Sequence, residues 1–127
     1  MKYTELERPS CFLAQISDIN KAYPKSAATL ESQLASILSN PESGARIPNF
    51  GEYHLRKARI NLPEYNISKA RGGRVIYIRL DESKQLFMIS VYLKKHYIVE
   101  DRAMKMVAKN FKSALLELKE RGYPASP

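Results

Sequence analysis

The chain has 127 residues, 44% of them hydrophobic and 27% charged, which is typical of one globular domain with a single core. Its one cysteine, Cys11, excludes an internal disulfide, and no apolar run approaches the roughly 18 residues that a membrane span needs. The formal net charge is +8, distributed as −1 over residues 1–43, +6 over 44–80 and +3 over 81–127. A cationic middle segment favours nucleic acid or an acidic protein as a partner, although surplus Lys and Arg also keep a surface soluble.

The first residues are polar and acidic, unlike a secretory signal, so we expect a cytoplasmic protein. Two amphipathic helices should follow. Ser10 can cap the first, which breaks between residues 20 and 24, and the second begins near Pro24 and ends at residues 40–44. Their apolar faces are formed by Phe12, Ile16 and Ile19, and by Leu30, Leu34, Ile37 and Leu38. The short connection predicts an antiparallel helical hairpin.

Three strands are expected at residues 54–62, 74–80 and 86–94, after a loop over 45–51. The last two strands should form a hairpin across the polar turn at 81–84.

The strand patterns indicate which face of the sheet is buried. In the first strand Ala58 and Ile60 point one way and Lys57 and Arg59 the other, as in a half-buried strand. The residues of the third strand that should share the core face are Phe87, Ile89, Val91 and Leu93.

A final helix should follow Glu100 and Asp101 and end near Gly122. Its apolar positions are Met104, Val107, Ala108, Phe111, Leu115 and Leu118. This order predicts an α+β fold of two layers, in which the N-terminal helical hairpin packs on a small antiparallel β-sheet that is followed by a C-terminal helix. We expect one domain over residues 1–127, with a core at about 12–112 and with 1–9 and 122–127 extended or frayed.

Several strings of the sequence resemble the RelE/ParE superfamily of bacterial toxins from type II toxin–antitoxin modules, above all its RelE- and HigB-like mRNA-cleaving branch. These strings are Tyr23-Pro24, LSNPESG at 38–44, LRKARI at 55–60, SKARGGRVIY at 68–77 and ISVYLKK at 89–95. The resemblance covers about residues 12–112. The chain departs from the common pattern by a longer N-terminus and a longer C-terminal helix.

The resemblance implies a RelE-like, microbial ribonuclease-like fold that enters the ribosomal decoding site and cleaves mRNA there. In this family a ribose 2′-hydroxyl attacks the adjacent phosphate, and no metal or other cofactor is used. A cognate antitoxin, either a helix-turn-helix or an acidic helical protein, silences the toxin, and operator DNA is contacted only through their complex. The implied partners are therefore the ribosome, mRNA and an antitoxin in the bacterial cytoplasm, with no membrane.

The resemblance also implies which residues react. Lys57 and Arg59 match two basic positions on the family's first core strand, although alternating cations also suit any solvated strand face. Arg74 matches the arginine before VIY, and its planar guanidinium can hold two phosphate oxygens while charge develops. The simpler alternative is that Arg74 pairs with a nearby carboxylate.

Three further catalytic candidates follow the third strand. Lys95 matches a family arginine, and His96 and Tyr97 lie near a region where other members supply Tyr or His. His96 suits either proton transfer because its unperturbed pKa is near neutrality, although an isolated histidine is often only a surface residue. His54, outside the basic pair, is a weaker candidate.

Four residues are expected to bind RNA rather than react. Lys69 and Arg71 lie in a glycine-bearing loop and should contact RNA backbone, as should Lys94. Tyr92 can either stack on a base or pack under the final helix. Gly72 and Gly73 in the same loop either allow a phosphate close to the backbone or simply form a turn.

Two other functions remain open at this point. A toxin of the same fold can inhibit DNA gyrase by binding alone, and a non-catalytic module of this fold can bind nucleic acid. The sequence contains no zinc-ligand spacing, no P-loop and no nucleophile elbow.

Overall fold

The computed structural model describes residues 2–123, so the last part of the predicted tail, 124–127, lies outside the described residues. The helices are α1 (Ser10–Ala22), α2 (Ala27–Ser39) and α3 (Glu100–Glu120), with short 3-10 helices η1 (Pro24–Ser26), η2 (Pro63–Tyr65) and η3 (Lys94–His96). The strands are β1 (Thr4–Glu5), β2 (Ala45–Ile47), β3 (His54–Ile60), β4 (Gly73–Leu80) and β5 (Gln85–Leu93).

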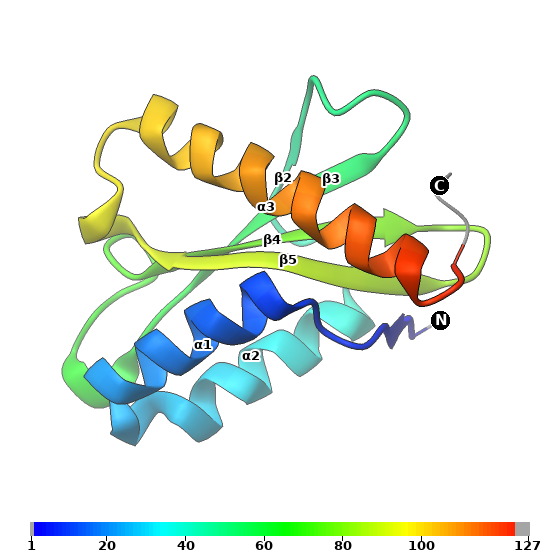
Figure 1. Cartoon of the computed structure of the whole chain (residues 1–127). Coiled ribbons are helices and arrows are strands. Elements are labelled where there is room, and N and C mark those ends of the chain that lie inside the picture. Colours follow the sequence, from blue (N-terminus) through cyan, green and yellow to red (C-terminus); the bar gives the residue numbers. More distant parts are fainter. Residues whose placement is uncertain (1, 124–127) are drawn as a thin grey trace.

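These strands form one sheet in the order β1-β5-β4-β3-β2, in which β1 runs parallel to β5 and all other neighbours are antiparallel. The predicted α+β fold, with a helical hairpin, a small sheet and a C-terminal helix, is confirmed (Figure 1). No helix within residues 2–123 is long and apolar enough to cross a membrane.

The helical hairpin α1–α2 packs on the sheet through the apolar faces that the sequence predicts. The buried residues of these faces are Phe12, Ile16, Ile19, Leu30, Leu34 and Ile37. One detail was wrong: Pro9 is the N-cap of α1, and Ser10 is its first helical residue. The N–H and Oγ of Ser10 each donate to the carboxylate of Glu117, at 2.9 Å, so an acid from α3 supplies the acceptor that a capping side chain would provide.

The expected two layers are in fact three, because α3 covers the face of the sheet opposite the helical hairpin (Figure 1). The cause lies in β4, where Val75 and Tyr77 pack toward the hairpin while Ile76 and Ile78 pack toward α3. A strand whose successive residues are all apolar needs cover on both faces.

An irregularity between β4 and β5 corrects the expected core face of β5. The register of the two strands shifts by one residue near the middle of β4, as a β-bulge does. Phe87 and Ile89 therefore pack on the α3 side, whereas Val91 and Leu93 pack on the hairpin side. These four residues do not share a face, because one extra residue inverts a pattern of period two.

Both edge strands were missed. The segment 45–51 was expected to be a loop, but its first three residues form β2 against β3, with only Ile47 buried. At the other edge β1 holds the N-terminal segment in place, and its neighbours Tyr3 and Leu6 are buried. Ala114 and Leu118 are buried as well, so the core extends beyond residues 12–112 at both ends.

Candidate functional site: a cationic groove

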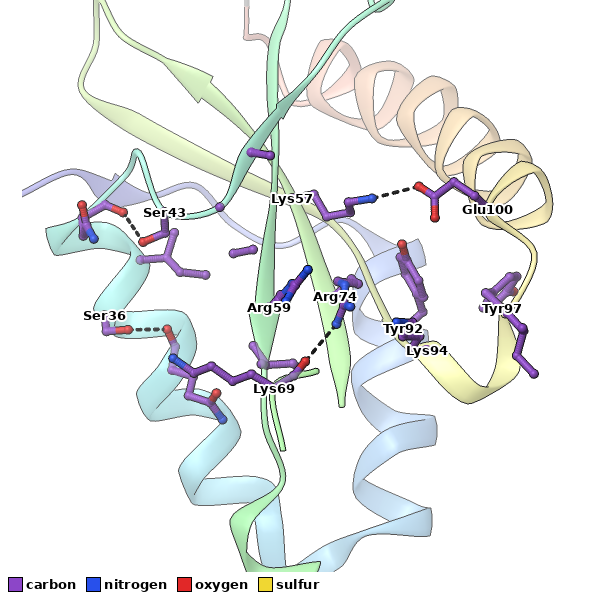
Figure 2. A pocket seen from close by; sticks show the side chains of 18 residues that line it. Ser36, Ser43, Lys57, Arg59, Lys69, Arg74, Tyr92, Lys94, Tyr97 and Glu100 are labelled. Carbon is purple, nitrogen blue, oxygen red and sulfur yellow. Dashed lines mark hydrogen bonds and ion pairs between the residues drawn. The ribbon is translucent and has the colours of Figure 1, made fainter. Parts of the chain in front are cut away.

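A groove of about 740 Å³ opens along the C-terminal half of β3, between α2 and the turn that leads into α3 (Figure 2). We call it the cationic groove, because its lining includes Lys57, Arg59, Lys69, Arg74 and Lys94. Two tyrosines and one carboxylate complete this wall: Tyr92, Tyr97 and Glu100. The α2 side contributes polar groups, among them Gln33, Ser36 and Asn40.

The sheet register explains why these side chains converge. Arg59 on β3 pairs with Arg74 on β4, and Arg74 pairs with Tyr92 on β5. Directly paired residues project from the same face of a sheet, and Lys57 joins them two residues before Arg59. Glu100, the first residue of α3, stands at the rim of this row (Figure 2).

Arg74 is a buried cation, only 7% exposed, that forms no ion pair with any described residue. Its Nη1 donates to the carbonyl oxygens of Lys69, at 3.1 Å, and Gly73, at 2.9 Å. Burial lowers the pKa of Arg74, and the charge of Arg59 lowers it further, although arginine remains protonated at neutral pH. A desolvated cation that no carboxylate neutralises marks a site where an anion binds favourably.

Lys57 differs from Arg74 because it already has an anionic partner. Its Nζ lies 2.8 Å from Oε1 of Glu100, whose side chain is 64% exposed. The sequence indicated Glu100 only as an acid suited to a helix N-terminus, so its place in the groove was missed. Its position soon after the cationic end of the third strand was a weak signal, but nothing in the spacing indicates that the first residue of α3 reaches Lys57 on β3.

The two tyrosines of the groove pack on each other, with ring centroids 5.3 Å apart and planes at 73°. Tyr92 is 5% exposed, and burial raises its pKa to about 12, so its hydroxyl stays protonated at neutral pH. The ring of Tyr92 has little free surface on which a nucleobase could stack. Its burial favours the alternative expectation, packing under the final helix. Tyr97 is the more accessible tyrosine of the pair.

Lys95 and His96 do not line the cationic groove, contrary to the predicted site. Residues 94–96 form η3, in which successive side chains point about 120° apart, so only Lys94 of the three reaches the groove. Lys95 instead contacts the hydroxyl of Tyr23 and lies over its ring. His96 lines a second pocket, of about 250 Å³, between α1 and the start of α3.

In the glycine-bearing loop at residues 68–73, the backbone at Gly72 packs against the neighbouring strands and leaves no room there for a ligand. A Cβ on Gly72 would lie 2.1 Å from the carbonyl oxygen of Ile60, and the Gly72 carbonyl accepts the N–H of Lys94 at 2.8 Å. Gly72 is therefore needed for packing, which favours the turn interpretation. In this loop Lys69 lines the groove, whereas Arg71 does not. His54 lies away from the groove, with Nε2 3.4 Å from Nη1 of Arg56.

Comparison with known proteins identifies a similar fold. No family model matches the sequence, and no curated protein sequence matches it significantly. Among solved structures the chain is similar to a double Arg-to-Ala mutant of the E. coli toxin RelE in the free state. That match has a TM-score of 0.54 and 17% sequence identity, and it covers 93% of this chain and 99% of the other. The fold is RelE-like.

This RelE-like fold brings together four of the six predicted catalytic residues. Lys57, Arg59, Arg74 and Tyr97 lie in one groove, together with the predicted RNA-binding residues Lys69, Lys94 and Tyr92. The chemistry available there is anion binding by lysine and arginine, with hydroxyl and carboxylate groups at the rim. Within residues 2–123, no group of three His, Cys, Asp or Glu side chains is placed to hold a metal ion.

Proposed function

We propose that this chain is the toxin of a type II toxin–antitoxin module and acts as an endoribonuclease that cleaves mRNA on the ribosome. The observation that carries the proposal is the convergence of Arg59 and the buried, unpaired Arg74 with three lysines in the cationic groove. Support also comes from the RelE-like fold, since the structurally similar E. coli protein is described as a toxin.

In the proposed reaction, a ribose 2′-oxygen attacks the adjacent phosphorus atom and the bond to the 5′-oxygen breaks, leaving a 2′,3′-cyclic phosphate. Negative charge on the non-bridging oxygens increases in the transition state, so cations fixed beforehand around the phosphate accelerate the step. Arg74 suits this role best. Its Nη1 is anchored on two carbonyl oxygens, while its Nη2 and Nε have no hydrogen-bond partner among the described residues.

Proton transfer needs a base for the 2′-hydroxyl and an acid for the leaving 5′-oxygen. Glu100 is the carboxylate of the groove, and we assign it the role of the base. Lys57, 2.8 Å away, orients this carboxylate. Tyr97 lines the same groove as Glu100, and its hydroxyl can act as the acid. His96 was expected from the sequence to transfer protons, but its side chain lines the second pocket. We therefore assign it no role in the reaction.

The proposal includes the partners that the resemblance implies. The toxin acts in the bacterial cytoplasm on ribosome-bound mRNA. A cognate antitoxin, a helix-turn-helix or acidic helical protein, neutralises it, and the pair contacts operator DNA through the antitoxin.

The test is primer extension on a cellular mRNA after brief induction of the chain, with Arg74→Ala as the variant and Arg71→Ala as the matched control. We expect cuts within translated regions that stop when translation is blocked. Arg74→Ala should lower cutting by about 100-fold or more, the typical cost of removing one group that stabilises an oxyanion. Arg71→Ala should change it only slightly, because Arg71 lies outside the groove.

Other outcomes contradict the proposal. Growth arrest without mRNA cuts would indicate the gyrase-inhibiting function instead. Equal losses in the two variants would mean that Arg74 only contributes charge. Folding of each variant is checked by circular dichroism and thermal unfolding before the comparison.

A further inference from the structure

The outer face of α3 carries a row of basic side chains that the cationic groove does not use. Arg102, Lys105, Lys109 and Lys112 are all exposed, and we call them the cationic stripe. Their spacing of three, four and three residues places them on one side of the helix, over about 15 Å at 1.5 Å per residue. The opposite side of α3 is buried on the sheet through Ala103, Val107, Ala114 and Leu118.

No acidic residue interrupts this row. The sequence contains neither Asp nor Glu from residue 102 to residue 116. Of the ion pairs in the described part of the chain, none involves a residue of the cationic stripe. Glu117, the next acid along α3, is bound to Ser10 and Arg121. Like charges at these helical spacings destabilise a helix, so the stripe is kept at some expense of stability.

The cationic stripe is separate from the groove. Arg102, at its first turn, lines the second pocket together with His96 and Asp18. Asp18 is the acid in that lining, and Asp101 directly precedes Arg102, but neither forms an ion pair with Arg102 among the described residues. Tyr92 and Tyr97 line both pockets and so stand between them.

We infer that the cationic stripe of α3 is a second RNA-contact surface, which binds the phosphodiester backbone of double-helical RNA. A protein partner would need apolar anchors among the cations, but the exposed large apolar residues near the stripe, Ile98, Val99 and Leu116, lie before its first cation and after its last. A membrane would need the apolar face of the helix, which is buried on the sheet. A single strand would gain from aromatic stacking, and the stripe has no aromatic residue.

This inference rests on the proposed function for the choice of RNA, since ribosomal RNA is largely double-helical and surrounds a toxin in the decoding site. On that basis the groove performs the reaction on single-stranded mRNA. The stripe supplies affinity for the surrounding structured RNA, through phosphate contacts that carry no sequence information.

The test compares two triple variants with equal net charge. The first is Lys105→Gln, Lys109→Gln and Lys112→Gln. The control is Lys2→Gln, Lys21→Gln and Lys25→Gln, three exposed lysines outside α3. Each variant lowers the formal net charge from +8 to +5. Binding to a 20-base-pair RNA duplex, to a DNA duplex of the same sequence and to single-stranded RNA is measured by fluorescence anisotropy over a range of KCl concentrations.

We expect the stripe variant to bind the RNA duplex about tenfold or more weakly at low salt. The slope of the logarithm of the binding constant against the logarithm of the salt concentration should be smaller in magnitude by about two to three, because each lost phosphate contact removes about 0.9 from it. The control should lose less than about threefold. Lys109→Gln alone should reduce the slope by about one, which provides a second measurement at minimal risk to folding. The stripe variant should unfold at the same or a higher temperature than the unchanged protein, since repulsion along α3 is reduced.

Equal losses in stripe and control variants would overturn the inference, because net charge alone would then explain binding. Unchanged duplex binding would overturn it in favour of an acidic protein as the partner of α3. Tighter binding to the DNA duplex or to single-stranded RNA would overturn the assignment of the ligand. Failure of the proposed function looks different: the unchanged protein would cut no mRNA, while its stripe-dependent binding to the RNA duplex persisted.

Discussion

The ion pair of Lys57 with Glu100 places one carboxylate among the cations of the groove. A carboxylate beside a lysine neutralises part of the positive charge that a phosphate would meet, so it weakens ground-state binding. In the proposed reaction the same carboxylate, the only one among the described residues that line the groove, accepts the 2′-hydroxyl proton. The carboxylate therefore weakens phosphate binding but assists the proposed reaction, so measuring binding and cleavage separately distinguishes the two effects.

Replacing Glu100 by Gln keeps the shape of the side chain and removes its charge. We expect single-turnover mRNA cleavage on ribosomes to fall by about 100-fold, the typical contribution of a general base, while binding of a short RNA to the isolated protein tightens. Faster cleavage in the variant would contradict the assignment, because Glu100 would then only withhold Lys57 from the phosphate. Glu120→Gln, at the far end of α3, is the matched control.

Protonation of His54 should make the stability of the fold depend on pH. Burial lowers the pKa of His54 below 6.5, and the nearby charge of Arg46 lowers it further. As the pH falls through about 6.5, the unfolded chain therefore takes up this proton before the folded chain does, and stability decreases. Urea unfolding at pH 7 and pH 5 should show this decrease in the unchanged protein and a smaller one in His54→Gln. An identical decrease in both proteins would rule out His54 as its source.

For single residues, the sequence predicted which residue types line the groove better than it predicted their positions. The alternation of Lys57 and Arg59 with apolar neighbours was enough to place both on one face of a strand, because side chains alternate strictly there. The positions of Lys95 and His96 depend on η3, a single 3-10 turn without any hydrophobic period to reveal it. Local spacing therefore could not distinguish Lys94, which faces the groove, from its two neighbours.

At the scale of elements, the segment from the end of α2 to β2 forms one wall of the groove and is held by one buried side chain. The hydroxyl of Tyr77 on β4 lies 2.7 Å from the carbonyl oxygen of Pro41 and 2.9 Å from that of Ser43, so these two acceptors share its one hydrogen. Arg56 adds bonds to the carbonyl oxygens of Glu42 and Gly44. The turn is thus fixed by side chains of β3 and β4 rather than by its own hydrogen bonds alone.

Tyr77→Phe should therefore lower the free energy of unfolding by about 1–3 kcal/mol, because two carbonyl groups, one of them bonded within the buried interior, lose their donor. Tyr65→Phe is the control: its hydroxyl accepts the exposed N–H of Lys25, which water can replace, and the change should stay within about 0.5 kcal/mol. Urea denaturation of both variants gives the comparison. Similar small values would show that the turn is held by other contacts.

The long elements were predictable because α1, α2 and α3 repeat apolar residues over several turns, β3 alternates, and β4 and β5 are apolar runs of strand length. The short elements were not. β2 has three residues and β1 has two, too few to show a period, and both are defined only by the strand that they pair with. The bulge in β5 is equally hidden, since residues 86–93 are buried on both faces and Ser90, the polar residue among them, is buried too, so no alternation reports the change of register.

At the scale of the whole molecule, positive charge lies on two surfaces, the cationic groove and the cationic stripe of α3. On the proposed function, we expect the protein that silences this chain to neutralise or cover at least one of them. We expect the cognate antitoxin to carry acidic or apolar residues that lie over the groove or over α3. In a co-purified complex, chemical labelling of lysines should therefore be reduced at Lys94 or Lys109 relative to the chain without its partner. Unchanged labelling at both positions would contradict this expectation.

The tight approach of backbone segments around the groove restricts which residues evolution can place there. Gly44 has φ +74, and a Cβ at this position would lie 1.9 Å from the carbonyl oxygen of Lys57. Gly72 is similarly constrained against Ile60, whereas Gly51 and Gly122 have open space around them. Descendants of the same ancestor should therefore retain glycine at 44 and 72 even where the surface charges have diverged. Two glycines that bracket a Lys-x-Arg strand thus offer a signature for recognising distant relatives by sequence when overall identity is low.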